Sequence, residues 1–117
     1  MPASKRDVID ATKEAVDAID AQVVAAFELK NTSSVANSAR MTDVINALNA
    51  QRTEIVLQDF KIAAGSRAMQ AALDKIRAAT KEMNETAAKM KTVTSFISNL
   101  AAFVGAGAKV VSALQGF

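Results

Sequence analysis

The sequence predicts an all-α protein, an antiparallel helical hairpin or bundle of three long helices. Half of the 117 residues are hydrophobic, and only four are Gly and one is Pro, a mixture that favours helix. An apolar seven-residue repeat runs unbroken from Met69 to Leu114, the period at which helices pack along one another at a shallow angle, as in a coiled coil. Turn-forming residues at 31–34 and 65–66 divide the chain into three segments of a single helical domain, residues 1–117.

We expect the first helix over about residues 4–30. Apolar side chains recur every seven residues at Ile9, Val16 and Val23, which defines the buried side. The other side is acidic and should face water: it carries Asp7, Asp10, Glu14 and Asp17. The segment Asn31–Ser34 consists of turn and cap formers and should end this helix.

We expect the second helix over about residues 34–64. Its apolar repeat consists of Met41, Leu48, Ile55 and Ile62. Its middle is polar and is a predicted weak point, with Asn46, Asn49, Gln51 and Arg52. Gly65 suits a left-handed residue after the helix, and Ser66 suits the N-cap of the next one.

The third helix should run over about residues 67–115, with an apolar C-terminal segment at 92–117. At 1.5 Å per residue it would be roughly 70 Å long, whereas its partners reach only about 40–45 Å. It therefore either projects beyond them or breaks near 92–95 and folds back to give a four-helix bundle. Thr92–Ser95 is hydroxyl-rich and suits a break, but the seven-residue phase continues through it. We favour the continuous helix on that ground and keep the bundle as the alternative.

The C-terminal segment changes character at the positions just before each repeat residue. Charged Lys75, Glu82 and Lys89 precede the repeat early on, whereas bulky Phe96 and Phe103 precede it later. The result is a broad apolar face, which we predict to be the interaction surface. It consists of Phe96, Ile97, Leu100, Phe103, Val104, Val110, Val111, Leu114 and Phe117.

Charge is unevenly distributed along the chain. Residues 1–30 carry four basic and six acidic side chains, and residues 61–117 carry eight basic and three acidic ones. Opposite net charge predicts that the first and third helices are neighbours. The basic side chains alternate with acidic ones and no aromatic platform accompanies them, so nucleic acid is not an expected partner.

Catalytic chemistry is not expected. Without His or Cys the chain has no histidine base, no catalytic triad and no zinc site of the usual kind. The four glycines do not form a phosphate-binding loop. We therefore predict no enzyme activity, no catalytic residue, no metal and no cofactor.

The expected function is a non-enzymatic interaction or assembly protein. The C-terminal apolar face would pair with a second copy of the chain, in a homo-oligomer, or with a helical protein partner. The alternative is a membrane- or lipid-surface-active protein, of a pore-forming or granule-coating type, that uses the same segment. Lys109 opposes spanning, since a Lys at the bilayer centre costs about 2.5–3.5 kcal/mol.

The chain begins with basic residues followed by Asp7 and Asp10 and not by an apolar stretch, so no ordinary signal peptide is expected. The predicted location is the cytoplasm, export without a cleaved signal peptide, or a membrane surface.

Overall fold

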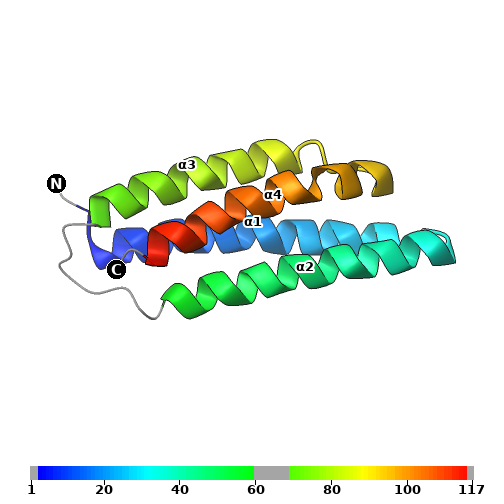
Figure 1. Ribbon diagram of the computed structural model, residues 1–117, viewed down its shortest axis with the longest axis horizontal. Coiled ribbons are helices and arrows are strands. Elements are labelled where there is room, and N and C mark those ends of the chain that lie inside the picture. The colour runs from blue at the N-terminus through cyan, green and yellow to red at the C-terminus, as the bar shows by residue number, and fades with distance from the viewer. Residues whose placement is uncertain (1–2, 60–68, 116–117) are drawn as a thin grey trace.

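Four α-helices form the protein in a computed structural model that describes residues 3–59 and 69–115. They are α1 (Lys5–Asn31), α2 (Val35–Asp59), α3 (Met69–Ala87) and α4 (Val93–Gln115), and these ranges contain no strand. Figure 1 shows the helices lying side by side along one long axis. The all-α helical bundle is confirmed, in its four-helix form. The continuous third helix is wrong, because the chain turns back between α3 and α4.

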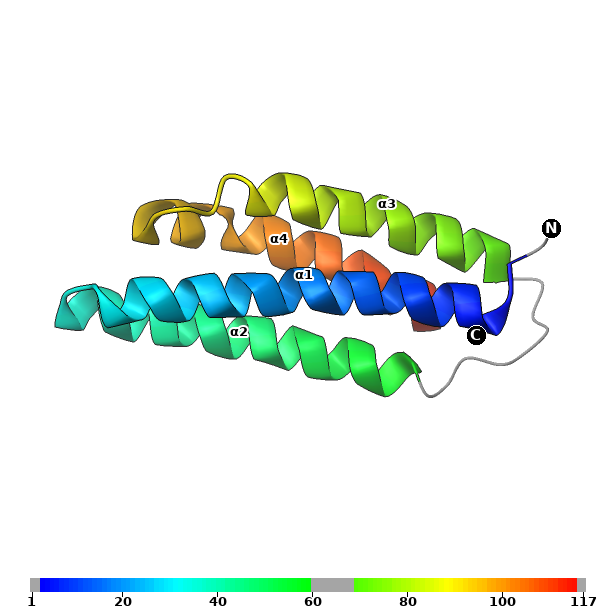
Figure 2. The ribbon, with the colours of Figure 1, turned by 180° about the vertical axis from the view of Figure 1, so that it is seen from behind.

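The four helices occupy the corners of a flattened bundle. α1 and α4 each contact both α2 and α3, whereas α2 and α3 make no contact with each other over the described residues. Figure 1 has α4 on the near side, and Figure 2, seen from behind, has α1 there. The predicted proximity of the first helix to residues 69–87 is confirmed.

α1 begins close to the predicted start near residue 4, and Ser4 is its N-cap. The main-chain N–H of Asp7 donates to Ser4 Oγ over 3.2 Å, and the N–H of Ser4 donates to Asp7 Oδ2 over 2.8 Å. This reciprocal capping box satisfies two N–H groups that the first turn leaves without partners. The main-chain hydrogen bond from Ser4 holds the pKa of Asp7 below its ordinary value, and the Ser4 side chain adds to the effect.

The predicted break at 31–34 joins α1 to α2. The hydroxyls of Thr32 and Ser33 both donate to the carbonyl of Leu29 at the end of α1. Ser34 Oγ then accepts from the N–H of Asn37 over 3.3 Å at the start of α2. Side-chain hydroxyls therefore replace the missing helical partners on both sides of the turn.

The turn between α3 and α4 uses the hydroxyl-rich segment in the same way. Thr92 Oγ1 accepts from the N–H of Ser95 over 3.1 Å, and Ser95 Oγ accepts from the N–H of Thr92 over 2.8 Å. Met90 remains buried at 3% exposure within the turn. α4 therefore begins with its own N-cap, so the break between α3 and α4 costs little free energy.

One apolar core contains side chains from all four helices. The four acidic side chains of α1 that were predicted to face water are exposed: Asp7, Asp10, Glu14 and Asp17. In α3 the buried residues follow the predicted repeat through Met69, Ile76 and Met83. In α4 the buried side includes Phe96, Phe103 and Val110, each at 0% exposure, which lie one residue before the predicted repeat. On the repeat itself Val111 and Leu114 are buried, whereas Ile97 is exposed and Val104 is half-buried.

Some predicted features lie outside the described residues. They are the stretch of the second helix beyond Asp59, with Ile62, the Gly65–Ser66 break, the start of the third helix at Arg67, and Phe117.

Candidate interaction surface on α4

The structure divides the predicted apolar face between the interior and the surface. Five of its nine residues are buried in the core of their own chain: Phe96, Phe103, Val110, Val111 and Leu114. Leu100 and Val104 are half-buried. Ile97 is 39% exposed. α4 folds back onto α2 and α3, so it does not project beyond the other helices, and its own chain covers the buried part of the apolar face.

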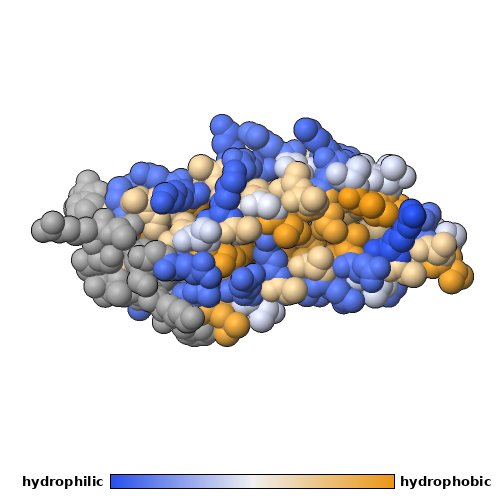
Figure 3. All heavy atoms as spheres, in the orientation of Figure 1, coloured by the Kyte–Doolittle hydropathy of each residue, from blue (hydrophilic) through white to orange (hydrophobic). Residues whose placement is uncertain are grey.

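The outward side of α4 is small, apolar and uncharged over most of its length. Its exposed residues between 97 and 108 are Ile97, Ser98, Ala101, Ala102, Gly105 and Ala108. A Cβ added at Gly105 would meet no atom within 4 Å, so no part of the described chain covers this position. Figure 3 shows hydrophobic residues gathered along the middle and right of this face, between hydrophilic margins. We call the exposed and half-buried residues at positions 97–108 of α4 the outer strip.

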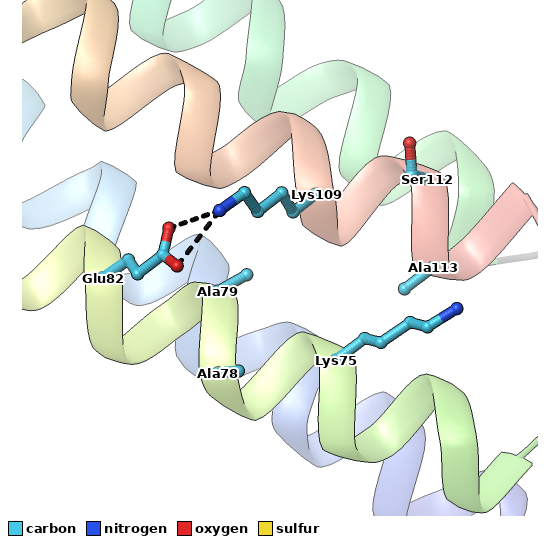
Figure 4. A pocket seen from close by; sticks show the side chains of 7 residues that line it. All are labelled: Lys75, Ala78, Ala79, Glu82, Lys109, Ser112 and Ala113. Atoms are coloured by element: carbon cyan, nitrogen blue, oxygen red, sulfur yellow. Dashed lines mark hydrogen bonds and ion pairs between the residues drawn. The ribbon is translucent and has the colours of Figure 1, made fainter.

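The charge of α4 is neutralised at the margin of the outer strip. Lys109 is its only charged residue, and its Nζ contacts both carboxylate oxygens of Glu82 on α3, at 3.0 and 2.8 Å. Figure 4 shows this pair beside Ala78, Ala79 and Ala113, which line the same pocket. The pocket has a volume of about 360 Å³. The pair is about half exposed, so it contributes little to stability. The carboxylate of Glu82 balances the positive charge of Lys109, so the pair as a whole is neutral.

A second groove adjoins the outer strip on the α2 side. It has a volume of about 300 Å³ and is lined by Val44, Ile97 and Leu100, with Arg40 and Asp43 at its edge. Both charged residues are exposed. Neither has an ion-pair partner within 4.0 Å among residues 3–59 and 69–115. Sequence reasoning did not select Arg40 or Asp43. The sequence signal for this pair was two opposite charges three residues apart on the second helix, followed by the apolar Val44.

Beneath the outer strip, Gln51 connects α2 to α4. It is 6% exposed, and its Nε2 donates to the carbonyl oxygen of Val104 over 2.7 Å. Its Oε1 is buried without a hydrogen-bond partner. Gly107 provides the room, since a Cβ there would overlap the Gln51 amide. The polar middle of the second helix was predicted to be a weak point. In the structure it includes a hydrogen-bonded contact with α4.

The other grooves offer little for chemistry. The α1–α3 groove, of about 570 Å³, is lined by exposed charged residues that include Glu14, Arg77 and Lys81. Within the part of the chain that the structure describes, no three His, Cys, Asp or Glu side chains are placed to hold a metal ion.

No family model, no curated protein and no solved structure matches this sequence. Among the described residues one helix, α4, is long and apolar enough to cross a membrane by length and composition. In the most apolar window of α4, 39% of the residues are buried within the bundle.

Proposed function

We propose that this protein is a non-enzymatic helical interaction protein that binds a protein partner, either a second copy or another helical chain, through the outer strip of α4. The observation that carries the proposal is the exposed, uncharged side of α4. The exposed side chains at positions 97–108 carry no charge, so covering them with a partner desolvates no ion.

The energetics of such a contact come from a few side chains. Ile97 and the half-buried Leu100 and Val104 still expose apolar surface, and burying such surface stabilises by about 25 cal/mol per Å². The small residues at Ala101 and Gly105 let a second helix approach closely, which increases van der Waals contact along the strip. The contact would be modest in size, since five residues of the predicted face are already used in the core.

The membrane- or lipid-surface-active alternative keeps one supporting observation, the length and apolar composition of α4. Two features count against it. Helices that lie in a lipid interface usually carry several basic residues on the polar side, whereas α4 has Lys109 alone, paired with Glu82. Spanning would also remove Phe96 and Phe103, both at 0% exposure, from the core.

The test is site-specific photo-crosslinking in cells with a photoreactive residue in place of Ala101 on the outer strip. The matched control replaces Ala21, an exposed alanine of α1. The expected result is a protein adduct from position 101 that position 21 does not give. Lipid adducts from position 101 would favour the alternative, and equal adducts from both positions would contradict a specific surface.

A further inference from the structure

We infer that the outer strip and its neighbouring groove bind a second copy of this chain about a two-fold axis, with Arg40 of each copy opposite Asp43 of the other. This inference rests on the proposed function and names the partner. The observation behind it is the groove of about 300 Å³ between α2 and α4, with one positive and one negative side chain at its edge.

The charge pattern of this edge is self-complementary. Arg40 and Asp43 are three residues apart, hence about one turn apart on the exposed side of α2. A two-fold axis between them reverses their order in the second copy, so that each cation faces an anion. A partner with a uniformly acidic or basic surface would instead gain from one of the two residues and be repelled by the other.

The apolar part of the surface is self-complementary as well. Ile97 lines the groove and is also 39% exposed. In an isologous contact the same patch supplies both the projecting side chain and the hollow that receives it. The Ile97 side chain of each copy would therefore enter the groove of the other, between Val44 and Leu100. The neighbouring Ala101 allows the two α4 helices to approach.

Four other large apolar side chains are exposed: Val24, Phe27, Val35 and Leu57. Val24, Phe27 and Leu57, at 59%, 45% and 57% exposure, do not line the grooves described above. Val35, at 90% exposure, follows the turn between α1 and α2. The groove beside Ile97 combines an exposed apolar side chain with two exposed charges of opposite sign, and neither charge has an ion-pair partner among the described residues.

The test is a charge-reversal pair, studied with the full chain by sedimentation equilibrium. Arg40→Glu makes the edge of the groove wholly acidic, and Asp43→Lys makes it wholly basic. Each variant alone should raise the dimer dissociation constant at least about tenfold, because like charges then face each other twice across the axis. An equimolar mixture should recover dimers, since the acidic edge of one variant then faces the basic edge of the other. Lys13→Glu, at an exposed position of α1, is the control and should dimerise like the wild type.

Three results would overturn the inference: a wild type that stays monomeric at its highest soluble concentration, dimers indifferent to both reversals, or a mixture that stays monomeric. Thermal unfolding of each variant checks that the fold persists. If the wild type is monomeric and position 101 crosslinks to a different protein, the two-fold contact is wrong. The proposed function is then still supported. Absence of any protein adduct at position 101 would remove the proposed function itself.

Discussion

The side-chain amide of Gln51 on α2 occupies the space where a Cβ would stand on Gly107 of α4. From that place Gln51 Nε2 donates to the carbonyl oxygen of Val104. The two residues are 56 positions apart in the chain, and each depends on the other. The absence of a side chain at Gly107 admits the amide, and the amide fills what would be a gap between the helices.

This relationship predicts strong coupling between substitutions at the two positions. Gly107→Ala alone should lower the free energy of unfolding by about 1–2 kcal/mol, because overpacking outweighs the gain in helix propensity. In a Gln51→Ala background the same change should raise it by about 0.5–1 kcal/mol, since the space is then open. Denaturant unfolding of the four proteins measures the coupling. Additive effects would mean that the amide does not lie against Gly107.

A second prediction concerns the buried, unpartnered Oε1 of Gln51. Gln51→Met keeps an unbranched side chain of similar length and removes the polar atom. Stability should change by no more than about 1 kcal/mol in either direction, because the substitution removes the hydrogen bond to Val104 but also removes a buried acceptor that has no partner. Urea denaturation gives the comparison. A loss above about 2 kcal/mol would show that the amide is better satisfied than the structure indicates.

The turn before α4 predicts where proline is tolerated. Val93 is the first residue of α4, and Thr92 precedes it as the cap. Val93→Pro should cost less than about 1 kcal/mol apart from lost side-chain contacts, because the first helical position tolerates proline. Ala101→Pro, in the middle of α4, should cost about 3 kcal/mol or more. If α3 and α4 were one continuous helix, both substitutions would lower the free energy of unfolding by a similar amount. Thermal unfolding of the two variants distinguishes these outcomes.

The pKa of Asp7 predicts a pH dependence. Hydrogen bonds from Ser4 hold this pKa below its ordinary value of 3.8. The ionised carboxylate therefore adds stability that is fully present above the unfolded-state pKa and is lost as pH falls through the folded-state pKa. The stability difference between wild type and Asp7→Asn should be constant near neutral pH and shrink below about pH 4. Melting temperatures over a pH series measure it, and a difference that grows in acid would contradict the assignment.

The elements predictable from the sequence were those set by local chemistry. The hydroxyl cluster at 31–34 ends α1, and the acidic side chains of α1 face water. The break before α4 was misjudged because the repeat continues from Met90 to Ile97. The signal for it was present: bulky Phe96 and Phe103 occupy the positions where α3 has charges, and these positions form the new buried side.

The surface was harder to predict than the fold. Sequence periodicity cannot tell which apolar residues a folded-back helix buries within its own chain, so Phe96 and Phe103 were expected at an interface. The groove beside Ile97 depends on the lateral packing of α2 against α4. That relation joins segments far apart in the chain, and no local pattern of residues encodes it.

The fold-back of α4 is the central claim, and a distance between residues 82 and 109 tests it most directly. The chain has no Cys, so Glu82→Cys/Lys109→Cys accepts two spin labels cleanly, and dilution with unlabelled protein removes distances between copies. Pulsed electron paramagnetic resonance should give a short distance, because Glu82 and Lys109 form an ion pair across α3 and α4 at 2.8 Å. A separation of roughly 40 Å, the span of 27 residues in a straight helix, would contradict the fold-back and with it the outer strip.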